Sequence, residues 1–139
     1  MTLVDRFTAL APIILGATRI VSGATFACYG AQKMFGVFGG VPAGVPPALI
    51  WTAGPIEFLG GLLIAIGLFT RGAAFLCSGF MAFAYFIGHA PNGFWPIMNG
   101  GVVAILYCWL FLNIAAQGAG AFAIDNIISR TRSRQSLTS

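Results

Sequence analysis

The sequence predicts an all-α protein, an integral membrane four-helix bundle with short loops. Of its 139 residues, 58% are hydrophobic and only 7% are charged, whereas a soluble domain carries about 25% charged residues. Apolar runs recur along the chain, and four of them approach the roughly 20 residues that a membrane-spanning helix needs. We therefore expect one domain over residues 1–129, followed by a basic tail over 130–139.

The first span is predicted over about residues 10–35. Its glycines recur every seven residues and form a stripe suited to close helix packing: Gly16, Gly23 and Gly30. Arg19 lies inside this span and Lys33 near its end, and steps of three and four residues place both on one helix face. A face with two cations is expected to turn towards protein or water rather than lipid.

The second span is predicted over 48–69, after a loop rich in Gly and Pro. Glu57 is the one ionisable residue in this run. Pro55 beside it kinks a helix and frees a backbone carbonyl, and Gly60 and Gly61 allow close approach of a neighbouring helix. This combination indicates a polar site inside a small membrane bundle.

The third and fourth spans are predicted over 73–89 and 97–116. Tyr85 and His89 lie one turn apart on the third span, and Asn99 lies near the start of the fourth. Residues 121–129 are expected to form a short interfacial helix. The tail from residue 130 is expected to be disordered, because it consists of Arg, Ser, Thr and Gln with a single Leu.

Basic residues are unevenly distributed between the two ends of the predicted spans. Lys33 lies at one end, and five arginines lie at the end of the termini: Arg6, Arg71, Arg130, Arg132 and Arg134. The positive-inside rule then places both termini in the cytoplasm. The net charge of +4 does not indicate nucleic-acid binding, because its arginines gather in a membrane-flanking tail that suits anionic lipid.

Helical rise places Arg19 about 13 Å, Glu57 about 18 Å and His89 about 24 Å from the cytoplasmic ends of their spans. Glu57 is therefore expected to face the interior, with Arg19 or His89 as its partner. One interpretation is a buried Arg19–Glu57 ion pair that fixes packing. The other is a proton path or a headgroup site for a small redox lipid, with Tyr85 and Asn99 as further polar groups. His89 can also be a simple interfacial residue.

No metal site is expected, because His89 has no second ligand at suitable spacing. The three cysteines form no C-x-x-C pair and are expected to be small buried hydrophobic residues: Cys28, Cys77 and Cys108. The chain also lacks a self-contained catalytic motif.

Three segments resemble the DoxX family of small four-helix bacterial membrane proteins: GAQKMFG over 30–36, GPIEFLGGLLIAIGLFTR over 54–71 and GAGAFAID over 118–125. The resemblance covers about residues 12–128. It implies a multi-pass protein of the bacterial inner membrane, with four residues at the family's polar positions: Lys33, Glu57, His89 and Asp125. It also implies a link to quinone-dependent membrane redox assemblies.

Three functions follow as expectations. The first is an integral membrane subunit of a quinone-linked redox complex, without a covalently bound cofactor of its own and with quinone or lipid as its ligand. The second is a non-catalytic structural or assembly subunit of a larger membrane complex. The third is a small proton or solute transporter. Expected partners are membrane lipids and either other membrane subunits or further copies of the chain. Any enzymatic role is at most that of a subunit of a quinone-linked oxidoreductase.

Overall fold

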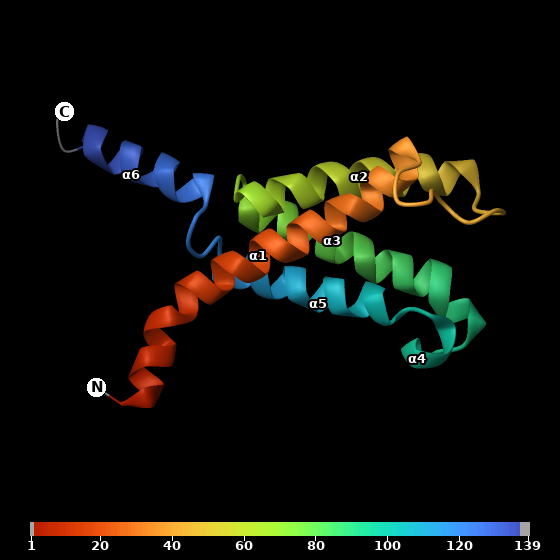
Figure 1. Cartoon of the computed structure of the whole chain (residues 1–139), viewed down its shortest axis with the longest axis horizontal. Helices are drawn as coiled ribbons and strands as arrows, with labels where there is room; N and C mark the ends of the chain where they lie inside the picture. The colour runs from red at the N-terminus through yellow and green to blue at the C-terminus, as the bar shows by residue number, and fades with distance from the viewer. Residues whose placement is uncertain (1, 137–139) are drawn as a thin grey trace.

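The computed structural model describes residues 2–136, which are mostly helical and contain no β-strand (Figure 1). The all-α prediction is therefore confirmed for this part of the chain. The elements are α1 (Leu3–Phe35), α2 (Pro47–Ile66), α3 (Thr70–Ala84), the π-helix η1 (Tyr85–His89), the 3₁₀ helix η2 (Ala90–Asn92), α4 (Pro96–Asn99), α5 (Val102–Gln117) and α6 (Ile124–Ser136). Both ends of the described chain lie at the same end of the bundle, on the left of Figure 1.

Three helical segments in residues 2–136 are long and apolar enough to cross a membrane: Leu3–Phe35, Pro47–Ile66 and Thr70–Asn92. The fourth apolar helix, α5, has only 16 residues, or about 24 Å at 1.5 Å per residue, against a hydrocarbon core of about 30 Å. The prediction of one helix over 97–116 is wrong in detail. Gly100, in the left-handed conformation at φ 74°, ends α4, and α5 begins two residues later.

Helix α1 begins seven residues before the predicted start, at Leu3. Thr2 and Asp5 explain the difference, because they form a reciprocal capping box: Asp5 N donates to the Thr2 hydroxyl, and Thr2 N donates to Asp5 Oδ2. Residues 3–14 are exposed, and this part of α1 bends away from the other helices (Figure 1). The helix is thus longer than a bilayer requires.

Helices α1 and α2 pack at backbone contact. A Cβ added to Gly23 would lie 2.5 Å from Ala65 N, and one added to Gly61 would lie 2.5 Å from Ala27 N. Gly30 meets the backbone of Phe58 in the same way. Gly60 instead faces the thiol of Cys77 on α3, and Gly16 faces the backbone of Ala121 beyond α5.

Helices α3 and α5 form the second close pair, and an apolar core joins the two pairs. Phe26 of α1 packs edge-on against Phe111 of α5, with ring centroids 4.9 Å apart. Both rings are almost fully buried, as are Ile64 and Ile114 beside them. Lipid is as apolar as these side chains, so it is their close van der Waals packing that holds the α1–α2 pair against the α3–α5 pair.

The segment after α5 crosses back beneath the bundle. Ala121 N donates to Pro12 O at 2.8 Å, and Asp125 N donates to Gly67 O at 2.9 Å. Helix α6 then projects away from the body (Figure 1). The predicted disorder from residue 130 is wrong up to Ser136, because α6 is helical to that residue. Residues 137–139 of the predicted tail lie outside the described residues.

Candidate functional site

Arg19 is completely buried, and every N–H of its guanidinium donates to a backbone carbonyl. Nη1 donates to the last turn of α2, and Nε and Nη2 donate to the segment after α5. The distances are 2.7 Å to Ile64 O, 2.5 Å to Ala65 O, 2.7 Å to Ala119 O, 3.1 Å to Ala121 O and 2.9 Å to Phe122 O. A guanidinium has five such donors in a fixed fork. Arg19 therefore caps α2 and clamps the returning segment, and it has no donor left for a carboxylate.

Glu57 pairs with Lys33 instead, with Oε2 2.6 Å from Nζ. The expected Arg19 or His89 partner is wrong, and the reason lies in side-chain direction. On an α-helix each Cβ points towards the helix N-terminus. Lys33 therefore reaches back from the far end of α1 to mid-bundle, whereas Arg19 reaches away from Glu57 towards the end of α2.

The ion pair lies beside a close approach of α1 and α2. The two side chains are only 16% and 8% exposed, and the flanking Gly30 and Gly54 bring the backbones together. The Tyr29 ring lies 5.7 Å from Lys33 Nζ and adds a cation–π contact. Since both charges are removed from water, each depends on the other.

Tyr85, His89 and Asn99 form a separate cluster at the opposite end of the bundle from the termini. Asn99 Nδ2 donates to Gly93 O at 2.6 Å and to the Tyr85 hydroxyl at 3.3 Å, and His89 Nδ1 lies 3.1 Å from Asn99 O. The Tyr85 hydroxyl donates to Phe94 O. The π-helix stacks the Tyr85 and His89 rings. These bonds fix the loop between η1 and α5.

The predicted polar site is thus three sites: the Arg19 clamp, the Lys33–Glu57 pair and the Tyr85–His89–Asn99 cluster. Residues 2–136 contain no group of three or more His, Cys, Asp or Glu side chains that could hold a metal ion. Among the cysteines, Cys77 is buried and Cys108 partly buried, but Cys28 is exposed, which corrects the prediction for that residue.

Asp125 and Arg71 close two helix ends. Asp125 Oδ1 and Oδ2 accept from Phe69 N and Thr70 N, each at 2.9 Å, at the start of α3. Arg71 donates to Ala115 O at 2.9 Å and to Ala116 O at 2.7 Å, at the end of α5. Sequence reasoning treated Arg71 only as a topological charge. Arg71 lies in the first turn of α3, and the helix end that it caps belongs to α5, so no local pattern in the sequence indicated this role.

Burial raises the pKa of Asp125, but the hydrogen bonds from Thr70 and Phe69 and the charge of Arg19 outweigh it, so the pKa lies below its usual value of 3.8. The ionised carboxylate is therefore the form that accepts these hydrogen bonds in the folded chain. It lies where the dipoles of α3 also favour a negative charge.

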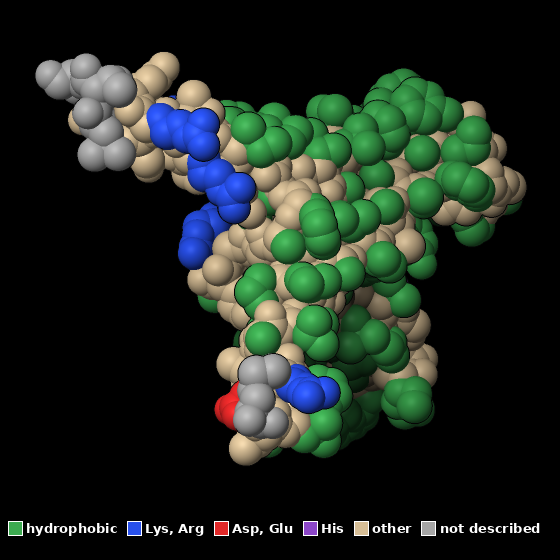
Figure 2. All heavy atoms as spheres, turned by 60° about the vertical axis from the view of Figure 1, so that its left-hand side comes forward, with side chains coloured by type: hydrophobic (Ala, Val, Ile, Leu, Met, Phe, Trp, Pro, Cys, Tyr) green, Lys and Arg blue, Asp and Glu red, His purple; other side chains and the backbone are tan. Residues whose placement is uncertain are grey.

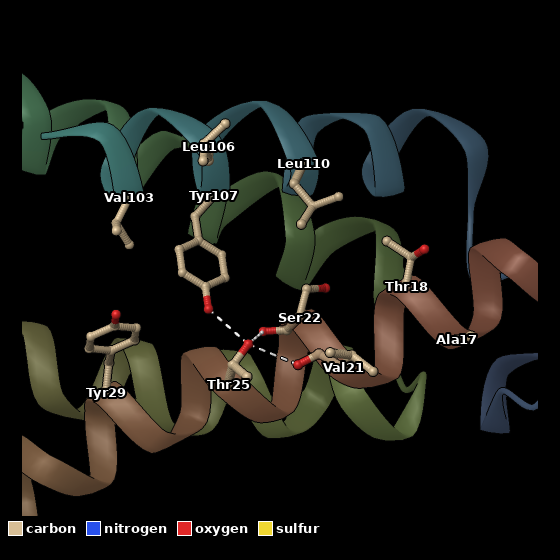
Figure 3. A pocket seen from close by; sticks show the side chains of 10 residues that line it. All are labelled: Ala17, Thr18, Val21, Ser22, Thr25, Tyr29, Val103, Leu106, Tyr107 and Leu110. Atoms are coloured by element: carbon tan, nitrogen blue, oxygen red, sulfur yellow. Dashed lines mark hydrogen bonds between the residues drawn. The ribbon is translucent and has the colours of Figure 1, made fainter. Parts of the chain in front are cut away.

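A cleft of 670 Å³ separates α1 from α5 (Figure 3). Its α5 wall is apolar except for Tyr107, whereas its α1 wall carries a row of hydroxyls at helical spacing: Thr18, Ser22, Thr25 and Tyr29. Tyr107 donates to Thr25 Oγ1 at 2.8 Å. The Tyr29 hydroxyl has no hydrogen bond within residues 2–136. Sequence reasoning missed this site, although the three- and four-residue spacing of the hydroxyls was visible.

Comparison with known proteins gives two matches. Residues 14–90 match the family model described as DoxX. The chain is also 44% identical over 122 residues to an uncharacterised protein of Haemophilus influenzae, in an alignment that covers 83% of this chain and 90% of that protein. No solved structure matches the chain.

Proposed function

This chain belongs to the DoxX family of membrane proteins, and we propose that it is a membrane subunit of a redox complex that binds a lipid quinone between α1 and α5. The observation that carries the proposal is the cleft, with its apolar α5 wall and its row of hydroxyls on α1. Ser22 and Thr25 donate to backbone carbonyls of α1, so the Tyr29 hydroxyl is a group that remains available to a ligand. The cleft volume also falls within the range of small-molecule sites.

The donor set suits a quinone headgroup. A quinone ring carries two carbonyl acceptors, and its isoprenoid tail needs an apolar channel. The Tyr29 and Tyr107 rings lie nearly perpendicular with centroids 6.3 Å apart, so they offer a hydroxyl donor and aromatic faces at one end of the cleft. Val103, Leu106 and Leu110 provide an apolar wall along the rest. In this proposal the chain binds and orients the quinone, and a partner subunit supplies electrons.

The test is a titration of the purified chain in nanodiscs with decylubiquinone. Quenching of tryptophan fluorescence measures the binding. Tyr29→Phe should raise the Kd about fivefold to tenfold, the usual effect of one lost hydrogen bond. Tyr107→Phe should raise the Kd less, because the Tyr107 hydroxyl donates to Thr25 Oγ1. Tyr85→Phe is the matched control, because it removes the remaining tyrosine hydroxyl of the chain outside the cleft. Equal binding by all three variants, or no saturable binding at all, would contradict the proposal.

A second candidate is a structural subunit that docks a partner through α5. Asn113 and Gln117 are exposed on α5 and hydrogen-bond to each other, and amides on an exposed membrane-helix face suit contact with another helix. Replacing both by Leu should release a co-purifying subunit. Proton transport through Glu57 has less support, because Lys33 holds its carboxylate between closely packed helices.

A further inference from the structure

Helix α6 forms a basic arm outside the bundle. It projects from the body (Figure 1), and Figure 2 shows Lys and Arg side chains gathered along it. After Asp125, the described part of α6 carries arginine but no acidic residue. Its first turns also expose an apolar group, because Ile127 is 66% exposed and Ile124 and Ile128 are each 37% exposed.

The root of α6 is fixed to the ends of the membrane helices. Asp125 caps α3 through two hydrogen bonds and donates its own N–H to Gly67 O. Asn126 Nδ2 donates to Gly120 O at 2.7 Å. The start of α6 therefore stays at the level at which α2 ends and α3 begins.

Two phenylalanines mark this level as the edge of the hydrocarbon. Phe69 and Phe122 are 72% and 71% exposed, and both have left-handed backbones, with φ of 50° and 58°. This conformation is unfavourable for a residue with a large side chain. Here it presents two apolar rings outward at the ends of the helices, and such rings are more stable in hydrocarbon than in water.

The arginines lie farther along α6 than one headgroup layer is thick. Arg130 and Arg132 follow Ile124 by six and eight residues, or about 9 Å and 12 Å along the helix axis. The headgroup layer occupies roughly 5–8 Å on each side of the hydrocarbon core. Since α6 leaves the bundle, a long arginine side chain on it reaches the phosphates of the same bilayer.

We propose that α6 is a lipid-binding arm that engages anionic phospholipid headgroups of the bilayer in which the chain is embedded. Ile127 and its neighbours contact the acyl boundary, and Arg130 and Arg132 bind phosphate. The positive charge of the arginines favours anionic lipid. Because the start of α6 is held at the ends of the membrane helices, the arm reaches the bilayer in which the chain itself is embedded. The proposal does not depend on quinone binding.

The test is hydrogen–deuterium exchange of the peptide over 126–136, with the full chain in nanodiscs of phosphatidylcholine alone or with about 30% phosphatidylglycerol. Anionic lipid should slow exchange in this peptide, and 1 M salt should reverse the effect. The Arg130→Gln/Arg132→Gln double variant should lose about 30-fold in protection. Ser129→Gln/Ser133→Gln is the control that changes the same helix without removing charge.

Equal exchange rates in the two nanodiscs would overturn the proposal, as would protection that appears only when an acidic soluble protein is added. The peptides of α2 and α3 serve as an internal reference, because a fold damaged by the substitutions would exchange faster there too. Decylubiquinone binding by the double variant should be unchanged, which separates this result from that for the cleft.

Discussion

Lys33 on α1 and Glu57 on α2 form an ion pair, with Nζ 2.6 Å from Oε2. The pair bridges two helices that touch at backbone distance, and each charge is largely removed from solvent. Loss of one partner leaves the other charge buried without compensation, which typically destabilises a protein by about 3–5 kcal/mol.

Glu57→Gln and Lys33→Met should therefore each lower stability in detergent, and the double variant should lose clearly less than the sum of the two. A double-mutant cycle from unfolding transitions measures this coupling. Arg6→Met combined with Glu57→Gln is the control, because Arg6 is exposed at the start of α1. Additive effects for Lys33 and Glu57 would show that the pair contributes no coupling energy.

Arg19→Lys should destabilise the chain strongly although it keeps the charge. A lysine has three donors against five for arginine and cannot reproduce the planar fork. Carbonyls of α2 and of the segment after α5 then lose their partner, at about 1–3 kcal/mol for each buried group left unpaired. Thermal unfolding in detergent measures the loss. Arg6→Lys should leave the melting temperature unchanged, and an equally small effect at Arg19 would refute the clamp.

Gly23→Ala and Gly61→Ala should lower the melting temperature, whereas Gly79→Ala should raise it. Alanine is normally favoured over glycine inside a helix by roughly 0.5–1 kcal/mol. A Cβ at Gly23 or Gly61 would meet the backbone of the facing helix, and one at Gly79 would meet nothing within 4 Å. Increased melting temperatures for all three variants would show that α1 and α2 do not meet closely at these glycines.

Asp125→Asn should lower stability at neutral pH, because the amide cannot accept from both Phe69 N and Thr70 N. A lost helix cap is worth about 0.5–2 kcal/mol. The pKa of Asp125 in the folded chain lies below 3.8. The contribution of its carboxylate is therefore complete above this value and disappears as the pH falls through the folded pKa. The melting temperatures of the two proteins should draw closer as the pH falls from 7 through the folded pKa, and a constant difference would contradict the assignment.

Both termini are expected in the cytoplasm, because five arginines lie at the end of the termini. In a background with Cys28, Cys77 and Cys108 replaced by Ala, Gly93→Cys should react with an impermeant thiol reagent added from the periplasmic side, and Arg134→Cys should not. The reverse pattern would refute the orientation.

The sequence predicted the helices correctly where the apolar character and length of a run were enough to specify them. The length and apolarity of the runs predicted helices that suit a membrane, and the residues over 54–71 and 118–125 predicted the family, which the comparison confirms. Gly100 shows the limit of this reasoning, since one residue in the left-handed conformation divides the predicted fourth span. The reciprocal bonds of Thr2 and Asp5 extend α1 by a similarly local feature that the hydropathy pattern does not report.

The partners of the buried charges were decided by tertiary structure. The depths estimated from helical rise placed Arg19 and Glu57 within reach of each other. Depth along a helix, however, does not specify the direction of a side chain. Because the Cβ atoms of α1 point towards its N-terminus, Lys33 reaches Glu57, and Arg19 reaches the carbonyls at the end of α2. The sequence by itself indicated that Arg19 and Glu57 lie inside the bundle, but it placed Lys33 only at the end of its span. The antiparallel packing of α1 on α2, and the return of the chain beneath them, decided what each charge binds.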